Sequence, residues 1–175
     1  MKLLVSQMIE GETAFHFVSD KDGWVREVLH RVEKRGYHVL ETMRLDVKLT
    51  KFEPDYYLRG QLQFDIEQTC ARCADNFKMP VQHRFDVALA HVSVPKVNRF
   101  ALSEESDVNF FEGNEIDLAP LVEEQFFLSI PYQAFCNPGC KGMCQKCGQN
   151  LNGGACDCLK ANPLTPFSVL QEYKC

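Results

Sequence analysis

The sequence lacks any long apolar run. Hydrophobic residues make up 45% of its 175 residues, but they occur in short stretches such as Phe126-Phe127-Leu128. A helix that spans a bilayer needs about 20 apolar residues in succession. The apolar start of the chain stops at Ser6-Gln7, which is too short for the apolar core of a signal peptide. We therefore expect a cytoplasmic protein that makes no use of a membrane.

The sequence also lacks the common motifs of catalysis and nucleotide binding. It contains neither a Gly-x4-Gly-Lys-Ser/Thr phosphate loop nor a Gly-x-Gly-x-x-Gly turn. The five histidines are dispersed, and His83 and His91 fit satisfied core or surface side chains better than metal ligands. No nucleophile or general base stands out. These absences predict a protein that is not an enzyme and has no small-molecule substrate.

Basic residues are missing from residues 104–124, which carry eight acidic side chains. Because the whole chain has a net charge of −5, the remainder carries +3. A basic RNA-binding domain needs a dense lysine and arginine face, so this balance does not indicate one. Two interpretations stay open for the segment. It is either a solvated acidic loop that leads into a helix or a strip that meets a basic protein. The residues that we assign to such a strip are Glu104, Glu105, Asp107 and Glu112.

Apolar residues alternate with polar ones in four segments, 13–18, 43–52, 56–68 and 81–91. Alternation with a period of two places the apolar side chains on one face of a strand. The Glu53-Pro54-Asp55 break reads as a hairpin turn. The pattern predicts a mostly antiparallel sheet with one buried face.

Helical periodicity appears in two longer segments. Residues 20–35 place Trp24, Val25, Val28, Leu29 and Val32 on one stripe, with Ser19 or Asp20 as the cap. We predict a second helix over residues 117–129 and a short third helix that begins at Pro166. The side chains expected to point inward from the second helix are Leu118, Leu121, Val122, Gln125 and Phe126. The fold class is therefore α+β, a sheet covered by helices with a C-terminal cysteine-rich zinc-knuckle segment. We expect an α+β body over residues 1–135, and a knuckle segment with the last helix over 136–175, packed on it or forming one domain with it.

Cysteine is abundant, with nine residues, and eight of them fall into two places. In a reducing cytosol, closely spaced cysteines indicate metal ligands more often than disulfides. Zinc prefers four thiolates in a tetrahedron, and a Cys-x2-Cys turn supplies two of them. Gly148, directly after such a turn, permits the left-handed backbone that directs N–H groups at the sulfurs. Two zinc ions are therefore predicted. Their ligands are Cys70, Cys73, Cys136, Cys140, Cys144, Cys147, Cys156 and Cys158.

The pairing of these cysteines is open. We favour a local site made by the last four, Cys144 to Cys158, so that Cys70 and Cys73 join Cys136 and Cys140. In the alternative, Cys70 and Cys73 face Cys144 and Cys147. An iron–sulfur cluster, a thiol redox pair and non-ligating cysteines are the other interpretations, each less favoured than structural zinc. Cys175 is alone and reads as a free thiol.

Three features of the sequence resemble the YceD family, the large ribosomal RNA subunit accumulation proteins. The first is the mid-chain Cys-Ala-Arg-Cys at the end of a strand. The others are the run from Glu115 to Pro131 and the run from Cys136 to Cys158 with the Asn162-Pro163 that follows. The family's closing motif usually reads Asp-Pro-Arg-Phe, whereas this chain has Asn-Pro-Leu-Thr-Pro-Phe at 162–167. No role of that arginine is therefore carried over.

The resemblance implies an accessory role in 23S rRNA accumulation or large-subunit assembly, with zinc supporting structure. The partner that it implies is a large-subunit precursor, through a ribosomal protein or 23S rRNA. Direct, sequence-tolerant RNA binding is the alternative, since residues 136–160 carry Lys141, Lys146 and Lys160 against Asp157. A thiol redox enzyme is the least favoured function.

Overall fold

The computed structural model describes residues 1–5, 11–52, 55–92 and 108–160. The chain divides into two compact units. The first unit contains residues 1–68 and 78–132, and the second contains residues 69–77 and 133–175. The boundary differs from the expected one at residue 135, because the hairpin tip with the first Cys-x2-Cys groups with the C-terminal residues. The helix expected from Pro166 lies outside the described residues.

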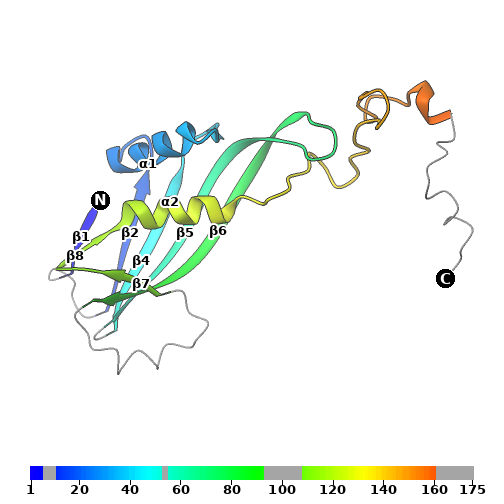
Figure 1. Ribbon diagram of the computed structural model, residues 1–175. Coiled ribbons are helices and arrows are strands. Elements are labelled where there is room, and N and C mark those ends of the chain that lie inside the picture. Colours follow the sequence, from blue (N-terminus) through cyan, green and yellow to red (C-terminus); the bar gives the residue numbers. More distant parts are fainter. Residues whose placement is uncertain (6–10, 53–54, 93–107, 161–175) are drawn as a thin grey trace, which may run out of the picture. The chain divides into compact units, whose positions relative to one another are not determined.

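The first unit is built on a six-stranded sheet with the order β2-β4-β5-β6-β7 and β3 beside β5 (Figure 1). The pairs β2–β4, β4–β5 and β3–β5 are antiparallel, whereas β7 runs parallel to β6. The mostly antiparallel α+β fold is thus confirmed. Its strands are β2 (Glu12–Val18), β3 (His38–Val39), β4 (Arg44–Phe52), β5 (Asp55–Thr69), β6 (Asn76–His91) and β7 (Val108–Phe111).

The alternation in the sequence corresponds to one buried face of this sheet. In β5, every second residue from Tyr56 to Ile66 is buried. Gly60 falls on this face, and the ring of Phe85 occupies the place of its side chain. A Cβ on Gly60 would lie 2.1 Å from Cζ of Phe85. Glycine is therefore required at this position for the aromatic ring to pack against the strand.

Two helices contribute to the same hydrophobic core, α1 (Gly23–Lys34) and α2 (Leu118–Ser129). The inward side chains expected for the second helix are all buried. They are Leu118, Leu121, Val122, Gln125 and Phe126. Figure 1 shows α2 crossing the strands of the sheet. Among the described residues, no helix is long and apolar enough to cross a membrane.

The first helix begins later than expected. Its N-terminal flanking residue is Asp22, and no side chain caps the helix. Ser19 and Asp20 have other partners, because the Ser19 hydroxyl accepts from the backbone N–H of Met43 and Asp20 accepts from the Thr42 hydroxyl. Both polar side chains therefore hydrogen-bond the turn before α1 to residues 42 and 43, which precede β4.

A separate two-stranded sheet pairs β1 (Lys2–Leu4) with β8 (Glu115–Asp117). Strands of three residues carry too little alternation to be read from the sequence, which is why neither was expected. Asp117 also caps α2, since its carboxylate accepts from the N–H of Ala119. The pairing places the start of the chain beside the start of α2.

The described part of the second unit has little regular structure. It contains the hairpin tip 69–77, a bridge between Met143 and Asn150, and a short 3-10 helix, Asp157–Lys160. The buried cluster in this unit consists of Cys70, Cys73 and Cys140, with Phe77 and Cys136 against it. A core composed mostly of cysteines has too little apolar area to fold a segment of this length by itself.

Candidate metal centre

The eight cysteines outside the C-terminus form two clusters of four within the second unit. In each cluster the four sulfurs lie within 4.8 Å of one another. The grouping is the one that we favoured from the sequence. The first cluster is Cys70, Cys73, Cys136 and Cys140, and the second is Cys144, Cys147, Cys156 and Cys158.

The spacing of the sulfurs fits a tetrahedral ion. Zinc–sulfur bonds of about 2.3 Å in a regular tetrahedron put neighbouring sulfurs about 3.8 Å apart. The Sγ atoms of Cys70 and Cys140 are 3.8 Å apart, and so are those of Cys73 and Cys136. Each cluster can therefore hold a metal ion. Four protein ligands would leave no coordination position open for a substrate.

The two Cys-x2-Cys turns have the same backbone. In the first, the N–H of Ala74 donates to the Cys70 carbonyl at 2.9 Å, and in the second Gly148 donates to Cys144 at 2.9 Å. The residue after each turn is left-handed, with φ of 59° at Ala74 and 74° at Gly148. The left-handed turn predicted at Gly148 is thus confirmed, and Ala74 adopts it at a steric cost.

We expect Ala74→Gly to stabilise the first turn. Relief of the left-handed alanine is worth about 0.5–1 kcal/mol, so exchange of the amides of residues 70–74 with solvent should slow a few-fold. Ala71→Gly in the same turn is the control, because Ala71 does not have a positive φ. Equal or opposite effects of the two substitutions would show that backbone strain at Ala74 is negligible.

Backbone and side-chain N–H groups favour the thiolate at two positions of the first cluster. The N–H of Cys136, followed by those of Cys73 and Arg72, lowers the pKa of Cys70 to about 6. The amide of Asn152, followed by the N–H of Gly142, lowers the pKa of Cys140. These donors favour the charged form that a metal ion binds.

The pKa values of the other two thiols of the first cluster are raised. The N–H of Asp75 favours the thiolate of Cys73, but burial and the neighbouring sulfurs outweigh it and raise its pKa to about 12. Burial, followed by the sulfur of Cys140, raises the pKa of Cys136. A divalent cation among the four sulfurs would displace these protons, because a coordinating thiol is deprotonated.

The second cluster repeats the arrangement nearer to solvent. The N–H groups of Cys147 and Lys146 lower the pKa of Cys144 to about 6, and the Lys146 nitrogen lies 3.5 Å from its Sγ. The hydrogen bond with Cys147, with burial second, raises the pKa of Cys158. Cys147 is exposed, whereas Cys144 and Cys156 are buried. An ion here would be more accessible than one in the first cluster.

Arg72 is a structural residue that reasoning from the sequence missed. Its Nη1 donates to the carbonyls of Pro138 at 3.3 Å and Cys140 at 3.2 Å. Its own carbonyl accepts from the N–H of Met143 at 3.0 Å, and its guanidinium lies over the Phe135 ring. Arg72 therefore ties the hairpin tip to residues 138–143, which include Cys140 of the first cluster and lead to the second cluster. Its position inside Cys-Ala-Arg-Cys was the only signal in the sequence.

Of the four residues assigned to an acidic strip, only Glu112 lies in the described part of the chain; Glu104, Glu105 and Asp107 do not. Glu112 is exposed and lines a cleft of about 340 Å³ in the first unit. The other polar groups of the cleft include Glu115, Asp117 and Glu124, over an apolar floor that contains Leu89 and Leu121. The described lining contains no basic side chain. Glu115 pairs with Lys2 at 2.8 Å and Asp117 with the N-terminal ammonium at 3.5 Å. Glu112 and Glu124 therefore supply the acidic charge that suits the cleft to a cationic partner.

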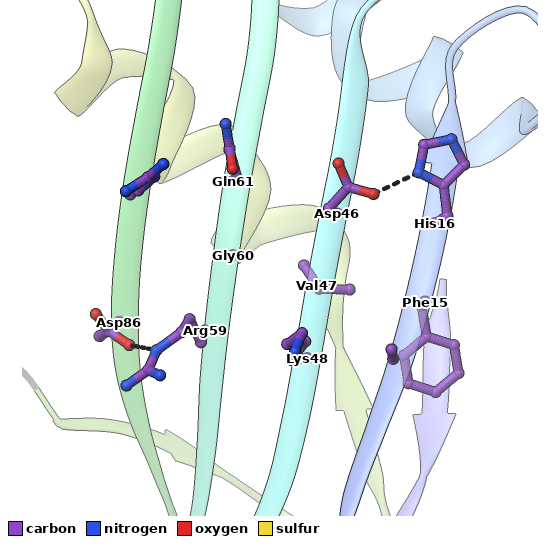
Figure 2. A pocket seen from close by; sticks show the side chains of 11 residues that line it. Phe15, His16, Asp46, Val47, Lys48, Arg59, Gly60, Gln61 and Asp86 are labelled. Atoms are coloured by element: carbon purple, nitrogen blue, oxygen red, sulfur yellow. Dashed lines mark hydrogen bonds and ion pairs between the residues drawn. The ribbon is translucent and has the colours of Figure 1, made fainter.

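A second hollow, of about 570 Å³, lies on the polar side of the sheet (Figure 2). Two pairs of its charged side chains bond across strands, His16 with Asp46 and Arg59 with Asp86, and the lining also contains Lys48 and Arg84. These pairs are more than half exposed, so they stabilise little. Lys48 pairs with Glu12, so most of these charges are compensated at the surface, as on a solvated sheet face.

The histidines show no clustering in the described residues. His83 bonds to the Gln125 amide oxygen at 3.0 Å, and His91 bonds to the Gly113 carbonyl at 2.8 Å. The interpretation of both as satisfied side chains is confirmed.

Comparison with known proteins finds one matching family and several related sequences. The sequence profile described as Large ribosomal RNA subunit accumulation protein YceD matches residues 58–174. The chloroplastic YCED homolog 1 of Arabidopsis thaliana is 47% identical over 47 residues, which are 27% of this chain and 15% of that protein. The Zea mays homolog is 43% identical over 49 residues, 27% of this chain and 17% of that protein.

A longer match is to an uncharacterized protein of Mycobacterium tuberculosis, 28% identical over 108 residues. These residues are 61% of this chain and 50% of that protein. The chain thus spans half or less of the length of each of these relatives. No solved structure matches it.

Proposed function

Because the chain belongs to the YceD family of large ribosomal RNA subunit accumulation proteins, we propose that it is a zinc-binding accessory factor that supports 23S rRNA accumulation and assembly of the large ribosomal subunit. It acts as a binding module and not as an enzyme. The observation that carries the proposal is the pair of four-cysteine clusters inside the matched residues. Closed sites of this kind stabilise structure, whereas a catalytic zinc keeps one position open.

In this proposal the zinc ions shape the second unit for binding. Zinc supplies four strong bonds at each cluster, and the Cys-x2-Cys turns, acting as zinc knuckles, direct N–H groups at the sulfurs. The cytosol, where thiols stay reduced, suits eight free cysteines. The acidic cleft of the first unit, with Glu112 at its rim, is the surface that we assign to a basic ribosomal protein on the precursor.

The purified protein is expected to hold close to two zinc ions per chain. Elemental analysis of protein prepared without oxygen measures the metal directly. Iron with a visible chromophore would indicate an iron–sulfur protein instead. Protein free of metal would contradict the zinc-binding part of the proposal.

Association with the ribosome is tested by co-sedimentation. In a sucrose gradient of cell lysate, the protein is expected to travel with precursors of the large subunit and not with mature ribosomes. A protein that stays at the top of the gradient in low salt would contradict the proposed role. The same fractions probed for 23S rRNA identify the particle.

Direct RNA binding by the second unit is the second candidate. It is favoured by the exposed side chains of Arg72, Lys141 and Lys146, although the Arg72 guanidinium already covers the Phe135 ring. Contacts with phosphates release counterions, so such a complex must weaken steeply with salt. A gel shift with a 23S rRNA fragment over a range of salt distinguishes the two candidates.

A further inference from the structure

A chain of side-chain hydrogen bonds joins the first cysteine cluster to the loop that runs between Cys147 and Cys156 of the second cluster. The amide Nδ2 of Asn152 donates to the sulfur of Cys140, in the first cluster, at 3.3 Å. Its Oδ1 accepts from the N–H of Lys141 at 2.8 Å. Its N–H and Nδ2 both donate to Oδ1 of Asn150 at 2.9 Å, and Nδ2 of Asn150 donates to the carboxylate of Asp75. Asp75 follows Ala74, the residue after the first Cys-x2-Cys turn.

Asn150 and Asn152 belong to the loop that closes the second cluster. This loop, residues 148–155, runs between Cys147 and Cys156, which are both in that cluster. It is held at its start by the N–H of Cys144, which donates to the Gln149 carbonyl at 2.9 Å. The N–H of Leu151 donates to Gly142 at 2.8 Å. The loop that carries Asn152 is thus flanked on both sides by ligands of the second cluster, so an ion bound there would fix the loop at its two ends.

We propose that the two metal sites are coupled, and that Asn152 is the positioning residue that couples them. An ion in the second cluster fixes the loop 148–155, and the fixed loop holds the Asn152 amide against the sulfur of Cys140. The first cluster then binds its ion more tightly. Coupling between two ligands is reciprocal, so an ion in the first cluster tightens the second by the same factor. The inference depends on the two metal sites of the proposed function.

The expected strength of the coupling follows from how strongly hydrogen bonds to metal ligands affect metal affinity. Residues that hydrogen-bond to metal ligands typically change metal affinity 10–100-fold when they are mutated, as an order of magnitude. Asn152 bonds to a ligand of one site and is carried by the loop of the other. We therefore expect an ion in either site to raise the affinity of the other site for its ion by about tenfold or more.

The second cluster is expected to load first. Its four ligands lie within residues 144–158, whereas Cys73 and Cys136 of the first cluster are 63 positions apart in the sequence. Closing a short segment costs less conformational entropy than closing a long one. Loading of the second cluster then prepares the Asn152 contact for the first.

The test is a thermodynamic cycle with Co²⁺ alone as the probe, in the full chain, reduced and stripped of metal. Cys156→Ser with Cys158→Ser leaves only the first site, and Cys70→Ser with Cys73→Ser leaves only the second. The overall two-ion constant of the unaltered chain is compared with the product of the two single-site constants. A ratio of about ten or more is expected, and Asn152→Ala should bring the ratio close to one.

Asn137→Ala is the matched control. Its Nδ2 also donates to a sulfur of the first cluster, Sγ of Cys136 at 3.4 Å, but Asn137 lies outside the loop 148–155. This variant is expected to weaken the first site while the ratio stays high. Asn150→Ala, which removes the link to Asp75, is expected to lower the ratio as Asn152→Ala does.

A ratio of one in the unaltered chain, or an undiminished ratio in Asn152→Ala, would overturn the coupling. Two ions that bind independently would refute only this inference and leave the proposed function intact. A chain that binds no ion would instead remove the metal sites themselves. Circular dichroism of the sheet of the first unit verifies that each variant is folded.

Discussion

Removal of the metal is expected to make residues 133–160 sensitive to proteases while the first unit stays resistant. The first unit has a core of aliphatic and aromatic side chains from the sheet and both helices. The buried cluster of the second unit consists of cysteines with Phe77 against them. Structural zinc contributes about 10–16 kcal/mol of apparent binding free energy in small zinc domains, so its loss should unfold the whole segment.

Cys144→Ser should have the same effect on the second cluster without a chelator. Cys144 is buried, and its sulfur accepts the N–H groups of the turn. Cleavage between residues 141 and 160 is expected to accelerate at least tenfold, with the sites followed by mass spectrometry. Cys175→Ser is the matched control, because Cys175 belongs to neither cluster of the described residues.

Equal resistance of the Cys144→Ser variant and the unaltered chain would show that metal does not organise this segment. Rapid alkylation of Cys70 or Cys144 in metal-loaded protein would point instead to reactive thiols. A bound and shielded thiolate should react slowly until a chelator removes the ion.

The sheet could be predicted because its strands bury one face only. In β5 the period of two extends without interruption through Tyr56, Leu58 and Ile66, so the strand is evident from its sequence. The hairpin was equally clear, since Phe52 pairs with Asp55. The parallel strand β7 was not, because four residues carry little periodicity and parallel pairing depends on partners distant in the sequence.

The sequence was enough to predict that the cysteines are metal ligands, but the structure was needed to group them into two sites. From the spacing alone, Cys70 and Cys73 could share a site with Cys136 and Cys140 or with Cys144 and Cys147. The contacts that select the grouping come from other residues, such as Arg72 and Asn152. Arg72 bonds to a carbonyl 68 positions away, and Asn152 bonds to a sulfur 12 positions away across a loop with little regular structure. No local pattern in the sequence encodes such contacts.

Reversing the charge of the acidic cleft is expected to weaken association with the large-subunit precursor. Glu112 and Glu124 are exposed on its lining, and neither has an ion pair among the described residues. Acidic side chains at such a rim attract a basic partner and repel rRNA. Replacing both by lysine changes the local charge by about four units, which alters electrostatically steered association by tenfold or more.

We expect Glu112→Lys with Glu124→Lys to weaken co-sedimentation with large-subunit precursors about tenfold at low salt. The loss should appear mainly in the association rate. It should shrink above about 0.15 M salt, where the screening length falls to about 8 Å. Further reversal of Glu104, Glu105 and Asp107 tests the remainder of the predicted strip.

Glu27→Lys with Glu33→Lys provides the matched control. Both residues are exposed on α1, in the same unit, and the double change alters the net charge by the same amount. If the effect depends on the cleft, this control keeps its association with precursors while the cleft variant loses it. If both variants lose association equally, net charge alone is responsible. Full association of the folded cleft variant at low salt would reduce the acidic segment to a solvated surface and leave the partner to be sought on the second unit.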